Sequence, residues 1–328
     1  MPSARAFVVL VLAAALAVAG CTGSSSGGAL TVGLGYIPSV QFAPFYLAQQ
    51  KGHYRDAGLA VTFQNKIDPD LVTLVGQGAI DVGLADGTSV IPAVSQGIPI
   101  RYVATVYRTF PSIVFAKEPS GIRTAADLKG KKLGIPGRYG SSWIMLQALL
   151  GSAGLKPENL TIVEYPDFGQ GAAVQQGAVD AATGFVNNEP IQLELAGQKT
   201  VVLHVDDVVP LPGPGLIAGT KTIDTKRDAV AKFVAATLRA MRDIAANQDA
   251  GLDASIAAVP DLAQTRDTQR AILAATIAAW TGGRNVAALG TIDRDGWSKS
   301  VDFMTGLGLA ANPVTVDQLV DERLLPAG

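Results

Sequence analysis

The sequence Gln-Gly-Ala-Ile-Asp-Val-Gly at residues 77–83 is echoed 99 residues later by Gln-Gly-Ala-Val-Asp-Ala-Ala at residues 176–182. Upstream of each copy, an apolar run breaks into a Gly/Pro turn, at residues 30–38 and again at 132–139. The offset is too long for a solenoid, whose repeats span about 20–50 residues. Two features that recur in the same order at nearly the same offset therefore predict two α/β lobes of common design.

Each repeated phrase is typical of a helix end, a glycine turn and a short strand that leads into a loop. The loops that follow are rich in polar residues, with Asp-Gly-Thr-Ser at 86–89 and Phe-Val-Asn-Asn-Glu-Pro at 185–190. A crevice between two lobes is a common place for a small molecule to bind. We therefore expect a ligand cleft between the lobes, with these two loops in its walls.

The bulk composition limits the class of protein. A chain of 328 residues is long enough for two domains, each with its own core. Hydrophobic residues make up 48% and charged residues 16% of the chain, which indicates a globular protein. The formal net charge of −2 provides no basic stripe of the kind that nucleic acids attract, so we expect no nucleic-acid partner.

The first 21 residues have the pattern of a targeting segment. Arg5 supplies a positive charge, and residues 7–18 form an apolar core that is too short to span a bilayer. Small residues precede Cys21, which matches a bacterial lipobox, although an ordinary signal peptide with a coincidental cysteine is the alternative. We interpret 1–21 as a lipoprotein signal peptide and 22–28 as a flexible tether. The expected product is an extracytoplasmic monomer that lipid on Cys21 anchors to the outer face of a bacterial membrane.

The strand pattern indicates where the chain passes between lobes. Strands at 100–107 and 112–117 flank Pro111 and are interpreted as the first crossing. Strands at 200–205 and 215–219 are expected to return the chain to the first lobe. We therefore assign residues 29–110 and 215–328 to lobe one and residues 111–214 to lobe two.

The last hundred residues change in texture to alanine-rich helix. Residues 228–246 repeat apolar side chains at helical spacing, and residues 265–280 form the longest of the helices expected after them. Nothing in these helices suggests chemistry. We expect them to pack against lobe one.

Seven segments form a recognisable set: 36–38, 42–48, 51–54, 57–59, 77–81, 128–134 and 188–190. Together they resemble the NMT1/THI5-like group of solute-binding proteins of ABC importers. The resemblance spans roughly residues 30–241. It implies the type II periplasmic binding protein fold, in which two α/β lobes joined by two crossover strands close over a ligand. An ABC permease with its cytoplasmic ATPase is the implied partner.

Within this group, Asn-Glu-Pro at 188–190 is more similar to binders of thiamine-pyrimidine precursors and riboflavin than to sulfonate binders. A carboxylate at Glu189 would repel an anion but could accept hydrogen bonds from the N–H groups of a ring. An anion site needs hydroxyls, backbone N–H groups and often a cation. We therefore predict an aromatic heterocycle as ligand. A sulfonate, taurine or nitrate-type anion is the alternative, and Arg138 would favour it by facing the cleft.

An enzyme on the same fold is the alternative of another class. Fungal thiamine-synthesis enzymes of this group carry a cysteine-rich iron-binding motif, whereas this chain has one cysteine and two histidines. It contains no nucleophile–base pattern or phosphate loop. His53 and His204 lack the spacing of metal ligands. We predict no catalytic residue, no metal and no cofactor.

Candidate ligand-binding residues come from the loops next to the expected cleft. Aromatic rings would stack on a planar ligand, at about 0.5–1.5 kcal/mol beyond burial, with core packing as the alternative role. Asp86 and Glu189 are expected to accept hydrogen bonds from the ligand, although either could instead cap a helix. Serines near a helix start could offer N–H groups to the ligand or act as N-caps. The candidates are Tyr36, Pro38, Asp86, Thr88, Tyr107, Tyr139, Ser141, Ser142, Trp143, Phe185, Asn187, Asn188 and Glu189.

Overall fold

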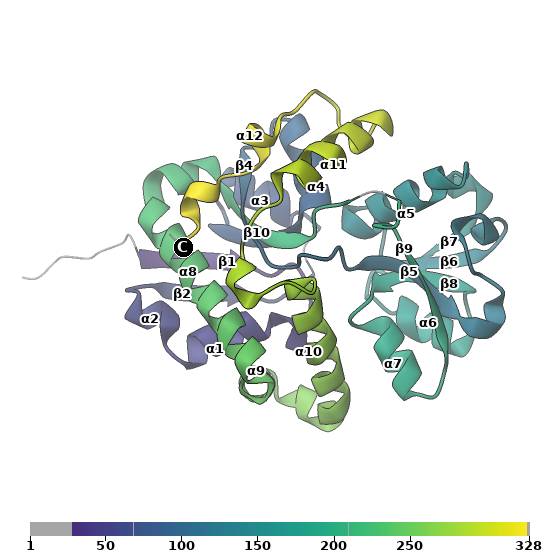
Figure 1. Ribbon diagram of the computed structural model, residues 1–328, viewed down its shortest axis with the longest axis horizontal. Coiled ribbons are helices and arrows are strands. Elements are labelled where there is room, and N and C mark those ends of the chain that lie inside the picture. The colour runs from purple at the N-terminus through teal and green to yellow at the C-terminus, as the bar shows by residue number, and fades with distance from the viewer. Residues whose placement is uncertain (1–27, 68, 209, 327–328) are drawn as a thin grey trace, which may run out of the picture.

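Two five-stranded sheets, one in each lobe, organise the computed structural model, which describes residues 28–67, 69–208 and 210–326 (Figure 1). The targeting segment and Cys21 lie outside these residues. In lobe one the strand order is β2-β1-β3-β10-β4, and in lobe two it is β7-β6-β8-β5-β9. The first sheet contains β1 (Ala29–Gly33), β2 (Ala60–Gln64), β3 (Val82–Asp86), β4 (Ile100–Thr105) and β10 (Pro214–Gly219). The second contains β5 (Ser112–Lys117), β6 (Lys132–Ile135), β7 (Thr161–Glu164), β8 (Ala181–Phe185) and β9 (Thr200–His204).

The two copies of the repeated phrase adopt the same local structure. Gly78 ends α3 (Leu71–Gln77) and Gly177 ends α6 (Gln170–Gln176), both in the left-handed region with φ of 76° and 77°. Glycine adopts this conformation without the steric cost that a Cβ atom carries. Each turn then leads into the central strand of its sheet, β3 or β8. The prediction of two lobes of common design is confirmed.

The aspartates of the two phrases also form equivalent hydrogen bonds with a neighbouring strand. Asp81 Oδ2 accepts a hydrogen bond from the backbone N–H of Thr31 at 2.9 Å, and Asp180 Oδ2 accepts one from that of Lys132 at 2.8 Å. Each carboxylate thereby ties the start of one strand to its parallel neighbour. In lobe one, Lys226 Nζ adds an ion pair with Asp81 Oδ1 at 2.8 Å.

Two segments connect the lobes, residues 106–111 between β4 and β5 and residues 205–213 between β9 and β10. β10 is antiparallel to both β3 and β4, and β5 is antiparallel to both β8 and β9. Strand 200–204 lies in lobe two, to which residues 111–214 were assigned, because β9 pairs with β5 there, and the chain returns to lobe one only after this strand. The irregular Gly/Pro-rich segment after β9 makes the return, and the lobe boundaries assigned from the sequence stay a prediction.

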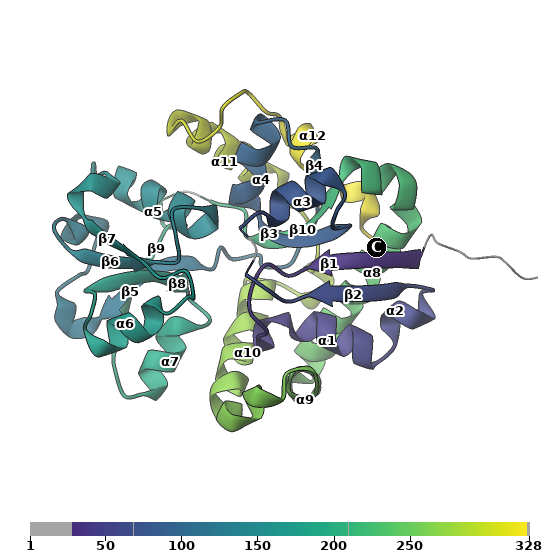
Figure 2. The same cartoon turned by 180° about the vertical axis from the view of Figure 1, so that it is seen from behind.

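Helices cover both faces of each sheet (Figures 1 and 2). In lobe one, α3, α4 (Gly87–Ser95), α11 (Arg294–Gly306) and α12 (Val316–Leu319) contribute to the core on one face. The other face carries α1 (Ala43–Gln50), α2 (His53–Asp56), α8 (Thr220–Ala246), α9 (Gln248–Ala258) and α10 (Arg266–Thr281). In lobe two, α5 (Gly140–Ser152) covers one face, and α6 with α7 (Glu189–Leu195) covers the other.

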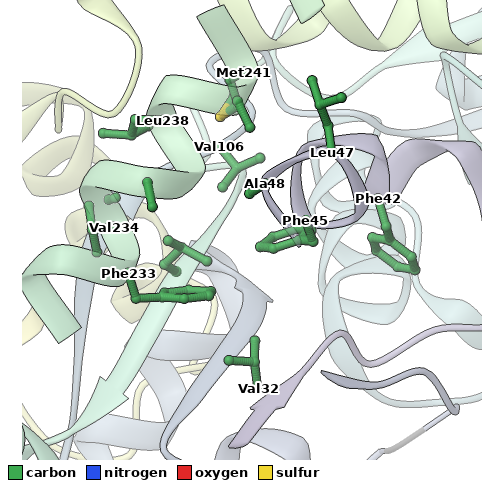
Figure 3. Packing of buried hydrophobic residues seen from close by; sticks show 14 of the residues in the cluster. Val32, Phe42, Phe45, Leu47, Ala48, Val106, Phe233, Val234, Leu238 and Met241 are labelled. Carbon is green, nitrogen blue, oxygen red and sulfur yellow. The ribbon is translucent and has the colours of Figure 1, made fainter. Parts of the chain in front are cut away.

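The largest core joins the first helix of lobe one to the C-terminal helices, as predicted. Phe45 of α1 stacks on Phe233 of α8 with ring centroids 6.4 Å apart (Figure 3). Tyr54 of α2 stacks on the same ring at 5.1 Å. Such pairs contribute roughly 0.5–1.5 kcal/mol beyond the area that they bury. Of the described helices, none is both long and apolar enough to cross a membrane.

Candidate ligand-binding site

A cavity of about 220 Å³ lies between the lobes. Its walls are the loops that follow β1 and β3 in lobe one and β6 and β8 in lobe two. These are carboxyl ends of parallel strands, the edge at which open α/β sheets bind ligands. Nine of the thirteen predicted residues line it: Tyr36, Asp86, Tyr107, Tyr139, Ser141, Ser142, Phe185, Asn188 and Glu189.

Aromatic rings from both lobes meet across the cavity. The ring of Tyr36 in lobe one stands edge-on to that of Phe168 in lobe two, with centroids 4.8 Å apart and an interplanar angle of 78°. Phe168 has a φ of 60°, the one positive value among the described residues other than glycine. Backbone strain of this kind persists where the surroundings hold it, and it gathers at ligand sites.

The carboxyl of Asp86 is set at the end of β3. Burial raises its pKa to about 6, and a hydrogen bond from the Ser141 hydroxyl partly offsets this effect. Asp86 occupies the N-cap position of α4, yet its side chain makes no capping bond, and Oδ1 has no protein partner among the described residues. The capping alternative therefore does not account for this carboxyl, which lines the cavity instead.

Glu189 approaches the same cavity from lobe two. Its Oε2 accepts a hydrogen bond from the Phe185 backbone N–H at 2.8 Å. Burial raises the pKa of Glu189 to about 7, and this N–H partly opposes the rise. A carboxyl that is protonated near neutral pH donates one hydrogen bond and still accepts others.

The glycine before Phe185 makes room for this carboxyl. A Cβ atom on Gly184 would lie 2.8 Å from Glu189 Oε2 and 2.7 Å from the ring of Phe115. Both distances are shorter than the usual contact distance of a Cβ atom. The bare backbone of Gly184 therefore allows Glu189 to sit beside the end of β8.

The start of α5 supplies free backbone donors at the cavity. The N-cap of this helix is Tyr139, without a side-chain cap, and Ser141 and Ser142 lie in the first turn. The serines are thus helix residues and not N-caps. The first N–H groups of a helix have no intrahelical partner and attract electronegative atoms.

The family model described as NMT1/THI5 like matches residues 39–251. The chain belongs to the NMT1/THI5-like family. It is 34% identical over 305 residues to the riboflavin-binding protein RibY of Chloroflexus aurantiacus. The aligned region covers 91% of this chain and 86% of RibY.

The chain is also similar to a synthase and to a solved binding-protein structure. The 4-amino-5-hydroxymethyl-2-methylpyrimidine phosphate synthase of Legionella pneumophila is 26% identical over 57% of this NMT1/THI5-like chain and 59% of that enzyme. The alkanesulfonate-binding protein SsuA of Xanthomonas axonopodis, solved with bound MOPS, superimposes with a TM-score of 0.68 and 18% identity. That match covers 91% of this chain and 98% of SsuA, and it shows the periplasmic binding protein fold.

Four predicted residues of this NMT1/THI5-like chain do not line the cavity. Pro38 is exposed on the loop after β1, and Thr88 is buried inside α4. Trp143 lies one turn into α5, because that helix begins at Gly140 and not at the tryptophan, and its ring packs against the core of lobe two. Asn187 is buried beside lobe one.

The one cation considered for the cleft faces elsewhere. Arg138 Nε donates to Glu164 Oε1 at 3.1 Å, with about half of each side chain exposed, and the guanidinium lies 5.4 Å from the centre of the Trp143 ring. Arg138 does not line the cavity. Among the described residues, no group of three or more His, Cys, Asp or Glu could hold a metal ion.

Several lining residues lie outside the predicted set, among them Phe168, Gln41 and Gln170. Gln170 is buried at the start of α6, where its Nε2 donates to the Thr183 carbonyl at 3.2 Å and its Oε1 has no protein partner in the described part of the chain. Gln41 and Gln170 both follow strand ends by a few residues. A buried amide near the carboxyl end of a strand is the signal that would have found them.

Proposed function

We propose that this protein is the solute-binding component of an ABC importer, which captures a small aromatic heterocycle by closing its lobes. The observation that carries the proposal is the interlobe cavity, where aromatic rings surround two buried carboxyls with pKa values near neutrality. Flat rings with polar edges fit such a site, because aromatic faces hold the ring and paired polar groups discriminate among edges. The family relationship and the likeness to RibY support it.

The polar groups suit a ligand that both donates and accepts hydrogen bonds. Asp86 and Glu189 can each donate when protonated and accept in either form. The first-turn N–H groups of α5 add donors for a carbonyl or ring nitrogen. An isoalloxazine, a pyrimidine or a related ring presents both kinds of atom along its edge. We favour riboflavin or a thiamine-pyrimidine precursor.

An anionic ligand fits the site less well. No Lys, Arg or His is among the described residues that line the cavity, and two carboxyls are. An anion bound there would lose its hydration without gaining an opposite charge. The N–H groups and serine hydroxyls at the start of α5 would suit a sulfonate, but the two buried carboxyls oppose it.

We also propose that binding is the whole chemistry of this chain. The synthases among its relatives match only part of the chain, whereas RibY matches most of it. We propose further that the protein acts as a monomer outside the cytoplasm. Lipid on Cys21, which lies outside the described residues, would hold it near a permease and its ATPase. A protein collected near its transporter delivers ligand without diffusing away.

A thermal-unfolding panel tests the proposed ligand class. Riboflavin, pyrimidines and thiamine form one arm, and taurine, alkanesulfonates and nitrate form the other. A ligand at 100 times its dissociation constant stabilises the folded protein by about 2.7 kcal/mol. We expect a shift with a heterocycle and none with the anions. A shift with anions alone would contradict the proposal.

A further inference from the structure

The side chain of Asn187 crosses the boundary between the lobes. It belongs to the loop after β8 in lobe two, and 1% of the residue is exposed. Its Nδ2 donates to Thr276 Oγ1 at 2.7 Å and to Gln41 Oε1 at 3.1 Å. Both acceptors belong to lobe one: Gln41 lies beside α1, and Thr276 lies on α10.

The hydroxyl oxygen of Thr276 is available to accept a hydrogen bond from Asn187. Its hydroxyl donates to the Ile272 carbonyl one turn earlier at 2.7 Å, so the oxygen is left to accept. The Asn187 amide supplies that donor from the other lobe. Both residues are almost fully buried, and buried hydrogen bonds are costly to leave unmade. The amide–hydroxyl pair can form only while lobe two lies against α10.

The same cluster touches the ligand cavity. Gln41 and Tyr107 both line the cavity, and the Tyr107 hydroxyl lies among the side chains of Asn187, Thr276 and Trp280. Tyr107 is on the first connection between the lobes. A ligand that packs against Gln41 and Tyr107 therefore orders two residues that also hold Asn187.

We infer that Asn187, Gln41 and Thr276 form an interlobe latch that stabilises the closed state and slows release of the ligand. The latch makes α10 part of the closing surface, although this helix contributes nothing to the cavity wall among the described residues. α7, which begins two residues after Asn187, packs beside α10 as well. The inference rests on the proposed closure of the lobes but not on the identity of the ligand.

Thr276→Val tests the latch, with Thr237→Val as a matched control. Both threonines are fully buried in lobe-one helices and donate to the carbonyl four residues earlier. Thr237 pairs with the Tyr54 hydroxyl at 2.9 Å, within lobe one. The two variants therefore lose comparable hydrogen bonds, and only Thr276→Val loses one that joins the lobes. Thr276→Ser keeps the hydroxyl and should restore parental behaviour.

The lobe arrangement is measured directly in the full chain. The chain has one cysteine, so Cys21→Ser leaves Gln264→Cys and Leu195→Cys as the only labelling sites. Both positions are exposed, Gln264 on lobe one just before α10 and Leu195 at the end of α7. With spin labels attached to the two cysteines, pulsed electron–electron double resonance then gives the distribution of distances between the labels, with and without riboflavin.

We expect Thr276→Val to lower the ratio of closed to open molecules about 2- to 10-fold, the range for one net hydrogen bond. The rate of riboflavin release should rise by a similar factor. Thr237→Val and Thr276→Ser should leave both unchanged. Equal effects of the two valine variants, or no short-distance population in the parental protein, would overturn the latch. Failure of riboflavin to bind would count against the proposed ligand, while the distances without ligand still decide the latch.

Discussion

Replacing Gly184, which lines the cavity with its backbone alone, with alanine should weaken ligand binding by displacing Glu189. The new Cβ atom would stand 2.8 Å from Glu189 Oε2, where ordinary contacts begin near 3.4 Å. The carboxyl must therefore move by about 0.6 Å. Such a move would disturb its 2.8 Å hydrogen bond from the Phe185 N–H, because length and angle both decide the strength of the bond.

The expected loss follows from the value of one hydrogen bond to a carboxyl. The displaced carboxyl would lose its own hydrogen bond to the ligand, and a bond of this kind contributes about 1.5–3 kcal/mol when one partner is charged, which corresponds to roughly 10- to 100-fold in the dissociation constant. The alanine also crowds the Phe115 ring at 2.7 Å, so thermal stability should fall too. Isothermal titration with the ligand found in the panel measures affinity in the folded protein separately from this cost.

Gly306→Ala is the control for this prediction. It lies at the end of α11, and a Cβ atom there meets nothing within 4 Å. Its affinity should match that of the parental protein. A folded Gly184→Ala protein that binds within twofold of the parental one would refute the assignment of Glu189 to the ligand site.

Three other outcomes are expected. Burial raises the pKa of Asp86 to about 6 and that of Glu189 to about 7. The folded state therefore binds more protons than the unfolded state, and the free energy of unfolding should fall as the pH rises from 4 to 8. Urea unfolding measures this fall, which should be smaller in Glu189→Gln. Phe168→Ala removes one ring of the interlobe contact. The binding free energy measured by calorimetry should become less favourable by about 0.5–1.5 kcal/mol, the value of an aromatic pair beyond its burial. Asp81→Ala should lower the free energy of unfolding more than Asp180→Ala, because only Asp81 also pairs with a lysine.

The sequence predicted the two-lobed architecture because its evidence is local and doubled. A glycine that ends a helix and an aspartate that ties two strands work over a few residues, and each occurs twice at one offset. The pairing of strand 200–204 could not be predicted for the opposite reason. An apolar strand fits either sheet, and its pairing with β5 depends on a partner almost ninety residues away.

Nine of the predicted residues line the cavity because loops after parallel strands converge on one edge. What the sequence could not give was the direction of each side chain. Trp143 and Thr88 lie near the right loops, but the helix start fixes which way they point. The Asn187 side chain bonds to Thr276 on α10, and nothing in the sequence around Asn187 predicts contact with that distant helix. Phe168 depends on a left-handed backbone that its sequence context does not signal.

The place of α10 in the chain bears on how relatives could be recombined. The family model ends at residue 251, before α10 begins at Arg266. A chimera that exchanged only the matched region would join one protein's cleft loops to another's α10. Such hybrids could retain a correct cleft and yet hold their cargo too briefly to deliver it. A ligand sensor built from this scaffold should therefore exchange the C-terminal helices together with the loops.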